Sequence, residues 1–369
     1  MHVLKEKNEV CTRKSNFELL RIVAMFMIVA SHYVVHGIIS FNPDYISEQV
    51  SMTNKLLVIA IGQGGNIAVT LFFMLTGFFL CRSENAKCLR VLLQTMFYAC
   101  CLFLLAIICK FLRVSLINSN SISLFSLIFL PLSSNHWWFV TSYILLIFMT
   151  PYINRFVRNI SKNKFACLVL FSICIWQTLG FIFNNYKVNS YYDIQRAICF
   201  YLLGAFTGLH IKRSSRKQIW FLTAIFIWGI SAFARYIFLC IPTESRICFA
   251  LFGAGRILIR AWIEPLIAFC IFMFFYGIDI VYNKIINTIA GCTFGVYLIH
   301  ECFFVRNILW NGLFHAYDSY SSPFLILDIF LASIVIFTFC IFVDFLRLKL
   351  LEPRILSFIK STKILETES

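Results

Sequence analysis

The strongest candidates for chemistry are Arg21 and His32, which lie in the first apolar segment of the chain. Eleven helical steps of ~100° make ~1100°, about 20° beyond three turns, so both side chains share one helix face about 16 Å apart. If that helix enters a bilayer at Phe17, His32 lies past the middle of the ~30 Å hydrocarbon core. A neutral imidazole in such a place can take a proton from a hydroxyl group, or can itself carry a transferred group.

Both residues also have ordinary structural explanations. Arg21 could pair with Glu18, three residues earlier, and extend toward the membrane surface. His32 could hydrogen-bond to a neighbouring helix. Because polar side chains are costly inside a bilayer, two of them on one face favour a polar cavity between helices.

Further polar and aromatic side chains occur in later apolar segments. Arg196 stands near the start of one segment, and Trp138 stands at the start of another. Tyr297 and His300 are one helical turn apart near the middle of a ninth segment, or beyond it. An interfacial position explains a tryptophan adequately, so these residues are weaker candidates than the first pair.

Some titratable residues are expected to have structural roles. Arg256, Arg260 and Glu264 recur every four residues, so they share a helix face and are expected to pair with one another at a membrane boundary. His36, one turn after His32, is expected at the outer surface.

A short loop after the second apolar segment carries the basic residues Arg82, Lys87 and Arg90. Basic residues in such loops commonly set the orientation of a membrane protein. The same cluster could instead hold the phosphates of a nucleotide-like ligand on the cytoplasmic side.

The elements that hold these residues are predicted to be membrane-spanning helices. Of the 369 residues 60% are hydrophobic and 13% are charged, and the mean hydropathy is +0.83, whereas soluble domains are about half apolar and a quarter charged. A bilayer span needs ~20 mostly apolar residues, and we expect ten: 17–39, 57–80, 89–112, 137–157, 165–183, 194–211, 218–240, 259–277, 286–304 and 324–346. The predicted fold class is an all-α, polytopic transmembrane helical bundle.

The distribution of basic residues predicts how the bundle is oriented. The net charge is +15, and 21 of the 32 lysines and arginines fall in segments that ten spans with a cytoplasmic N-terminus leave in the cytoplasm. This is the positive-inside pattern, and it also explains the basic charge without a nucleic-acid partner. We therefore expect a cytoplasmic N-terminal segment (1–15), a transmembrane domain (16–350) and a cytoplasmic tail (351–369).

Several function classes lack their signature residues. The sequence contains no G-x-S-x-G, P-loop, Rossmann or H-E-x-x-H motif, so neither a hydrolase nor an ATP-driven machine is indicated. Nearly all of the 15 cysteines lie in apolar segments, where they act as small hydrophobic residues, and none forms a C-x-x-C pair or a zinc-like Cys/His set. We expect no bound metal.

Five short motifs, in order along the chain, resemble those of the membrane-bound acyltransferase-3 family. They are Asn16-Phe-Glu-Leu-Leu-Arg21 continuing to His32, Leu71-Phe-Phe-Met-Leu-Thr-Gly77, His136-Trp-Trp-Phe with Pro151, Arg196 through Gly204, and Phe294-Gly-Val-Tyr-Leu-Ile-His300. The resemblance extends over nearly the whole chain.

This resemblance implies a bacterial plasma-membrane enzyme that moves an acyl group, usually acetyl and sometimes succinyl. The donor would be cytoplasmic acyl-CoA, a co-substrate rather than a bound cofactor, and the acceptor a sugar hydroxyl of a surface polysaccharide or its lipid-linked precursor. Arg21 and His32 would be the essential pair, and Arg82 and Arg90 would contact the CoA. Candidate substrate-binding residues are Glu18, Trp138, Arg196, Tyr297 and His300.

Two other classes of function stay open from the sequence. A transporter or flippase for a glycan or lipid-linked sugar would also suit ten spans with buried charges, although transporters often contain two related halves and no such relation is seen. A structural partner in an envelope assembly would leave Arg21 and His32 on one face unexplained.

Overall fold

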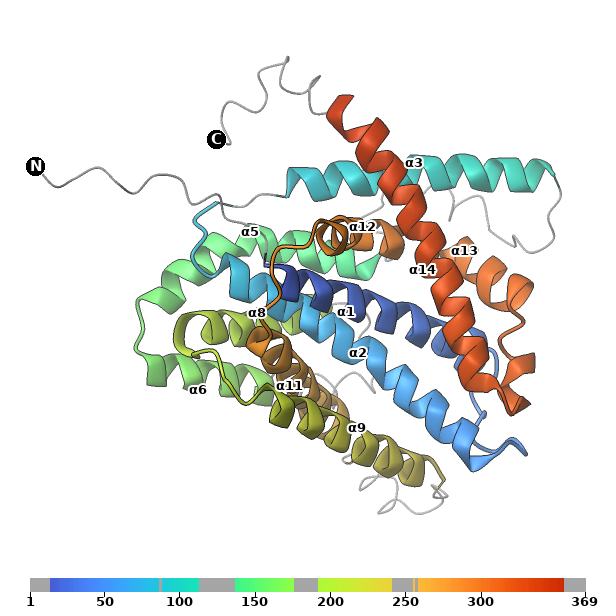
Figure 1. The fold of residues 1–369 in the computed structure, drawn as a ribbon, viewed down its shortest axis with the longest axis horizontal. Helices are drawn as coiled ribbons and strands as arrows, with labels where there is room; N and C mark the ends of the chain where they lie inside the picture. Colours follow the sequence, from blue (N-terminus) through green and yellow to red (C-terminus); the bar gives the residue numbers. More distant parts are fainter. Residues whose placement is uncertain are drawn as a thin grey trace, which may run out of the picture.

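The computed structural model describes residues 14–85, 88–112, 137–175, 192–240, 255 and 258–354. In this part of the chain the regular structure is helical and no β-strand occurs, which confirms the expected all-α fold (Figure 1). Outside the described residues lie most of the two terminal segments, the stretch 113–136 that includes His136, and the residues Lys87 and Arg256.

The described helices follow one another in the order expected from the apolar segments. They are α1 (Ser15–Val34) with its π-helical extension η1 (Val35–Ile39), α2 (Met52–Leu80), α3 (Leu89–Phe111), α5 (Trp138–Arg158), α6 (Lys162–Ser172), α8 (Tyr192–His210), α9 (Lys217–Cys240), η3 (Ile259–Ile263) running into α11 (Glu264–Gly277), α12 (Lys284–His300), α13 (Phe303–Asn307), η4 (Ile308–Leu313), η5 (Asp318–Ser321) and α14 (Leu325–Leu350).

Among the described residues, seven helices are long and apolar enough to cross a membrane, or eight if α12 and the helix after it form one bent span. The helices α1 with η1, α2, α3, α5, α9, η3 with α11, and α14 make up the seven. The expected fifth span begins as α6 and continues beyond the described residues, and the sixth corresponds to α8. The chain is thus a multi-span membrane protein, and the count of ten with cytoplasmic termini stays a prediction.

The central helix is α1, which packs against α2, α11, α12 and α14 (Figure 1). Side chains at its first turn hold it to two later helices. Ser15 Oγ accepts a hydrogen bond from the Asn283 backbone N–H (2.8 Å) at the start of α12, and Asn16 Nδ2 donates to the Phe275 carbonyl (2.9 Å) near the end of α11. These buried contacts fix the position of α1 and therefore of Arg21 and His32.

Two glycines of the sequence motifs allow α2 and α8 to pack with their backbones in contact. A Cβ atom on Gly77 would collide with the Tyr201 carbonyl oxygen of α8, and one on Gly204 would collide with the Met74 carbonyl oxygen of α2. Small residues permit such close approach between membrane helices. The motif glycines therefore hold α8 against α2, and α2 in turn packs against α1.

The ninth expected span differs from the straight helix at 286–304 that the apolar pattern predicts. The helix α12 ends at His300, Cys302 adopts an extended conformation, and the chain turns by 79° before α13 begins at Phe303. Apolar composition sets where a helix can form, but it does not detect a single extended residue that interrupts the helix. The bend leaves Glu301 at the turn, inside the bundle.

Candidate active site

One face of α1 lines two cavities. Arg21 and Met25 line a cavity of about 290 Å³, which we call the Arg21 cavity. Ile28, His32 and residues further along α1 and η1 line a second cavity of about 430 Å³, which we call the His32 cavity. Spacings of three and four residues keep these side chains on one helix face, so the shared face predicted for Arg21 and His32 is confirmed.

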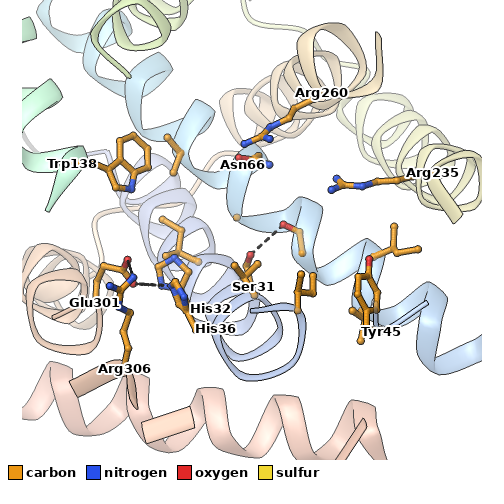
Figure 2. A pocket seen from close by; sticks show the side chains of 18 residues that line it. Ser31, His32, His36, Tyr45, Asn66, Trp138, Arg235, Arg260, Glu301 and Arg306 are labelled. Atoms are coloured by element: carbon orange, nitrogen blue, oxygen red, sulfur yellow. Dashed lines mark hydrogen bonds and ion pairs between the residues drawn. The ribbon is translucent and has the colours of Figure 1, made fainter. Parts of the chain in front are cut away.

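Three titratable side chains surround His32. His36 and Glu301 line the same cavity (Figure 2), and His300 contacts His32 from α12. His32 Nδ1 lies 3.0 Å from His300 Nε2 and 2.9 Å from Glu301 Oε2. His36 Nε2 lies 3.4 Å from the same oxygen of Glu301. Neither contact with Oε2 has the angles of a good hydrogen bond, so Glu301 acts on the two imidazoles mainly through its charge.

The partners of His300 assign the protons in this cluster. His300 Nδ1 lies 2.6 Å from the Val296 carbonyl oxygen, which only accepts hydrogen bonds, so Nδ1 carries the proton. The ring is fully buried and therefore neutral, which leaves Nε2 as an acceptor for a proton on His32 Nδ1. In neutral His32 the free lone pair is then on Nε2, which has no hydrogen-bond partner within the described part of the chain.

Glu301 is held in place by a cation on its other side. Arg306 Nη1 donates to Glu301 Oε1 over 3.1 Å, and the carboxylate is almost completely buried. A buried carboxylate with one guanidinium and two imidazoles around it is well placed to stabilise a positive charge on His32. The cluster has the parts of a general base with an orienting acid, as in other acyl-transfer sites.

By distance alone, His32, His36 and Glu301 could also hold a metal ion, because one ligand atom from each lies within 4.8 Å of the others. Arg306, however, places its positive charge against Glu301, and His300 already contacts the Nδ1 atom of His32. A second cation so close to Arg306 is electrostatically unfavourable. The absence of a metal stays our prediction.

The Arg21 cavity combines cationic and aromatic side chains. Arg21 donates to both oxygens of Glu18 (2.9 and 3.1 Å), so the predicted pair exists, yet Arg21 also lines the cavity. Arg90 lines it from α3, whereas Arg82 is exposed in the turn after α2 and does not line it. The structure therefore brings Arg90, which was predicted to contact the CoA, together with Arg21, and leaves Arg82 outside this cavity.

Arg90 belongs to a chain of charged contacts that connects α3 to α14. Its Nε atom lies 3.4 Å from Glu352, which accepts from Arg347 over 3.0 Å, and Arg347 donates to the fully buried Asp344 over 2.7 Å. Tyr98 of α3 donates to the same Asp344 over 2.7 Å. None of the sequence motifs pointed to this network, which fixes the helix that carries Arg90.

The other predicted substrate-binding residues differ in whether they line the His32 cavity. Trp138 lines the His32 cavity from the first turn of α5 (Figure 2). Tyr297 is buried one turn before His300 on α12. Arg196 does not line the cavity but donates to the Asn66 carbonyl (3.0 Å), and Asn66 does line it.

Several residues of the site escaped the sequence reasoning. His36, expected at the outer surface, is partly buried: its side chain lines the His32 cavity and contacts Glu301. Glu301 and Arg306 were not predicted, although a carboxylate directly after His300 in an apolar segment was a usable signal. Glu264 forms its ion pair with Arg235 of α9 at 3.6 Å, a partner that spacing within one helix cannot reveal.

Two aromatic side chains of the Arg21 cavity are close in sequence to residues of the His32 cavity: Phe72 follows Val69 by one turn of α2, and Phe139 follows Trp138 on α5. Phe72 and Phe139 both line the Arg21 cavity, with ring centroids 6.0 Å apart. Phe139 also packs edge-on against Tyr297 at 5.6 Å. Along α1 the lining residues Met25 and Ile28 are three helical steps apart, about 4.5 Å along the axis.

Comparison with known proteins assigns the family. The family model Acyl_transf_3, described as an acyltransferase domain, matches residues 14–344. That match contains α1 through most of α14, and with them both cavities. The comparisons with curated proteins and with solved structures found no match. The chain therefore belongs to the acyltransferase-3 family and is a membrane acyltransferase.

Proposed function

We propose that this protein transfers an acyl group, most simply acetyl, from cytoplasmic acyl-CoA to a sugar hydroxyl of a surface polysaccharide or its lipid-linked precursor. We place it in the bacterial plasma membrane. The observation that carries the proposal is the cluster around His32, in which Nδ1 is engaged by His300 and Glu301 while Nε2 keeps its lone pair.

The reaction follows from that proton arrangement. The acceptor hydroxyl oxygen attacks the thioester carbonyl carbon while His32 Nε2 takes the hydroxyl proton. Glu301 stabilises the resulting imidazolium by its charge. The tetrahedral intermediate collapses with cleavage of the carbon–sulfur bond, and the thiolate leaving group takes the proton back from His32. Transfer through an acyl group carried on His32 would use the same nitrogen atom.

The donor side of the proposal rests on Arg21 and Arg90. Acyl-CoA is highly charged and does not cross a bilayer by itself, so its thioester must reach His32 through the protein. Guanidinium groups bind phosphate in bidentate fashion, and both arginines line the Arg21 cavity. The pantetheine arm would pass Phe72 and Phe139 to reach the His32 cavity, which requires those rings to move.

The acceptor side is supported by a neighbouring hollow of about 450 Å³, which shares His36 and Arg306 with the His32 cavity. Its other lining residues are Ser40, Phe41, Phe303, Asn307 and Asn311. Amide side chains and aromatic rings are groups that can hydrogen-bond and stack against sugars. The hollow offers room for further sugar units beside the one that is acylated. The transporter or flippase alternative gains no support from the family match.

The test is mass spectrometry of surface glycans from cells with the protein, without it, and with His32→Asn. We expect a mass increment of one acyl group that is lost in both the deletion and the variant. The matched control is His315→Asn, because His315 is exposed and has a positive φ of 44°, which asparagine tolerates. Acylation that persists in a His32→Asn protein would refute the assignment of the base. An unchanged glycan mass in the deletion would refute the proposed reaction.

A further inference from the structure

A buried carboxylate joins three helices beside the Arg21 cavity. Asp344 of α14 is fully buried, and Arg347, one turn later, donates to both of its oxygens over 2.7 and 3.3 Å. Tyr98 of α3 donates to Oδ1 of Asp344 over 2.7 Å. Gly295 of α12 leaves room for the carboxylate, because a Cβ atom at this position would collide with it. Asp344 and Arg347 form an ion pair, and an ionised carboxylate only accepts hydrogen bonds.

The same carboxylate fixes the orientation of a side chain that lines the Arg21 cavity. Gln94 of α3 lies one turn before Tyr98, and its amide group lies 3.1 Å from Asp344 Oδ1. Because that oxygen only accepts, the amide nitrogen Nε2 of Gln94 must face it. The carbonyl oxygen Oε1 of Gln94 is therefore directed away from Asp344, and within the described part of the chain it has no hydrogen-bond partner.

Gln94 is also chemically distinct within the cavity. Among the described residues that line it, Gln94 carries the only side-chain carbonyl group. The hydroxyls of Thr76 and Thr293 already donate to carbonyls of their own helices, each over 2.8 Å. Most of the remaining lining is apolar and includes Phe72 and Phe139. The cavity thus presents one oriented carbonyl oxygen in largely apolar surroundings.

An oriented acceptor in such surroundings suits an amide N–H. The pantetheine arm of CoA contains two secondary amides joined by apolar carbon segments, and an amide N–H that leaves water is costly without an acceptor. We infer that Gln94 accepts a hydrogen bond through Oε1 from an amide N–H of the pantetheine arm. This rests on the proposed use of acyl-CoA. Gln94 is then a donor-binding residue, and Asp344 is a positioning residue that acts through it.

The test measures binding of CoA and therefore needs no acceptor. Isothermal titration calorimetry of the purified protein in detergent compares CoA with two analogues, each of which has an ester oxygen in place of one amide N–H. One analogue should bind the wild-type protein about three- to tenfold more weakly than CoA, the range expected for one neutral hydrogen bond. The weakened analogue identifies the amide that Gln94 contacts.

A variant then assigns this difference to Gln94. Gln94→Met keeps the length of the side chain and removes its amide, so it should weaken CoA binding by the same factor. It should also bind CoA and the weakened analogue equally, within about twofold, as a double-mutant cycle requires for one shared contact. Tyr98→Phe is the matched control, because it removes a neighbouring hydrogen bond to the same oxygen of Asp344, whereas Tyr98 does not line the cavity. Tyr98→Phe should keep the wild-type difference between CoA and the analogue, even where it lowers the midpoint of thermal unfolding.

Three results would overturn the inference and leave the proposed reaction standing. The first is equal affinity of the wild-type protein for CoA and both analogues, and the second is a Gln94→Met protein that discriminates between them as the wild type does. The third is the same loss of discrimination in Tyr98→Phe, which would assign the effect to the packing of α3. Failure of the wild-type protein to bind CoA would instead overturn the donor side of the proposed function, and this inference with it.

Discussion

Removing the charge of Glu301 tests how the site stabilises a protonated His32. Glu301→Gln keeps the size of the side chain and removes the negative charge that lies 2.9 Å from His32 Nδ1. Two unit charges with centres about 4 Å apart interact by roughly 4 kcal/mol at an effective dielectric constant of about 20. Arg306 opposes part of this attraction, so about 2–4 kcal/mol of transition-state stabilisation is at stake.

A loss of that size predicts a fall in kcat of about 30- to 1000-fold. The glutamine amide can also donate to Nδ1 of His32, which would leave the remaining proton on Nε2 and remove the base. Both effects act on the chemical step, so the KM values for acyl-CoA and for the acceptor should change little. Glu301→Asp restores the charge at a greater distance and should recover part of kcat.

The assay is acyl transfer by the purified, reconstituted variants at saturating donor and acceptor. Asp279→Asn is the matched control, because it removes an exposed carboxylate that pairs with Arg213 and lies before the start of α12, whereas His300 of the cluster is at the end of that helix. A kcat for Glu301→Gln within threefold of wild type would refute the role given to Glu301. A rise in KM without a fall in kcat would assign Glu301 to substrate binding instead.

Three further predictions concern the Arg21 cavity, the contact between α2 and α8, and the absence of a metal ion. Gly291→Phe should lower kcat/KM for acyl-CoA by at least tenfold, because Gly291 lines the Arg21 cavity and a side chain at this position would extend into open space. Gly229→Phe on α9 is the control, because Gly229 has equally open surroundings. Equal effects of the two variants would contradict a donor role for the cavity. Gly204→Leu should destabilise the bundle by several kcal/mol through its collision with the α2 backbone, so thermal unfolding in detergent should fall well below that of wild type, and an unchanged midpoint would disprove the close contact. Prolonged dialysis against EDTA should leave acyl transfer within twofold of the untreated protein, with less than a tenth of a metal ion per chain by elemental analysis; a loss of activity restored by Zn²⁺ would show instead that His32, His36 and Glu301 hold a metal.

Much of the site could be predicted because helix periodicity is a local property. The interval from Arg21 to His32 is enough to place both side chains on one face of α1, and in the structure this face lines both cavities. The ion pair between Glu18 and Arg21 is likewise a contact within one turn. The motif glycines Gly77 and Gly204 could also be identified from the sequence. The physical reason for glycine there, contact between the backbones of α2 and α8, could not.

The sequence by itself determined the all-α membrane character, the order of the helices and the face of α1 that carries the chemistry, because each depends on residues close together in the chain. Only the tertiary structure decided the partners of His32. His300 is 268 positions away, and it reaches His32 because α12 packs against α1. Glu301 enters the cluster because the chain bends by 79° directly after His300. Arg235 and Arg260 meet in one cavity because α9 and η3 converge there. Side chains on different helices acquire a common site only when the helices pack, and no spacing along the chain records which faces will meet.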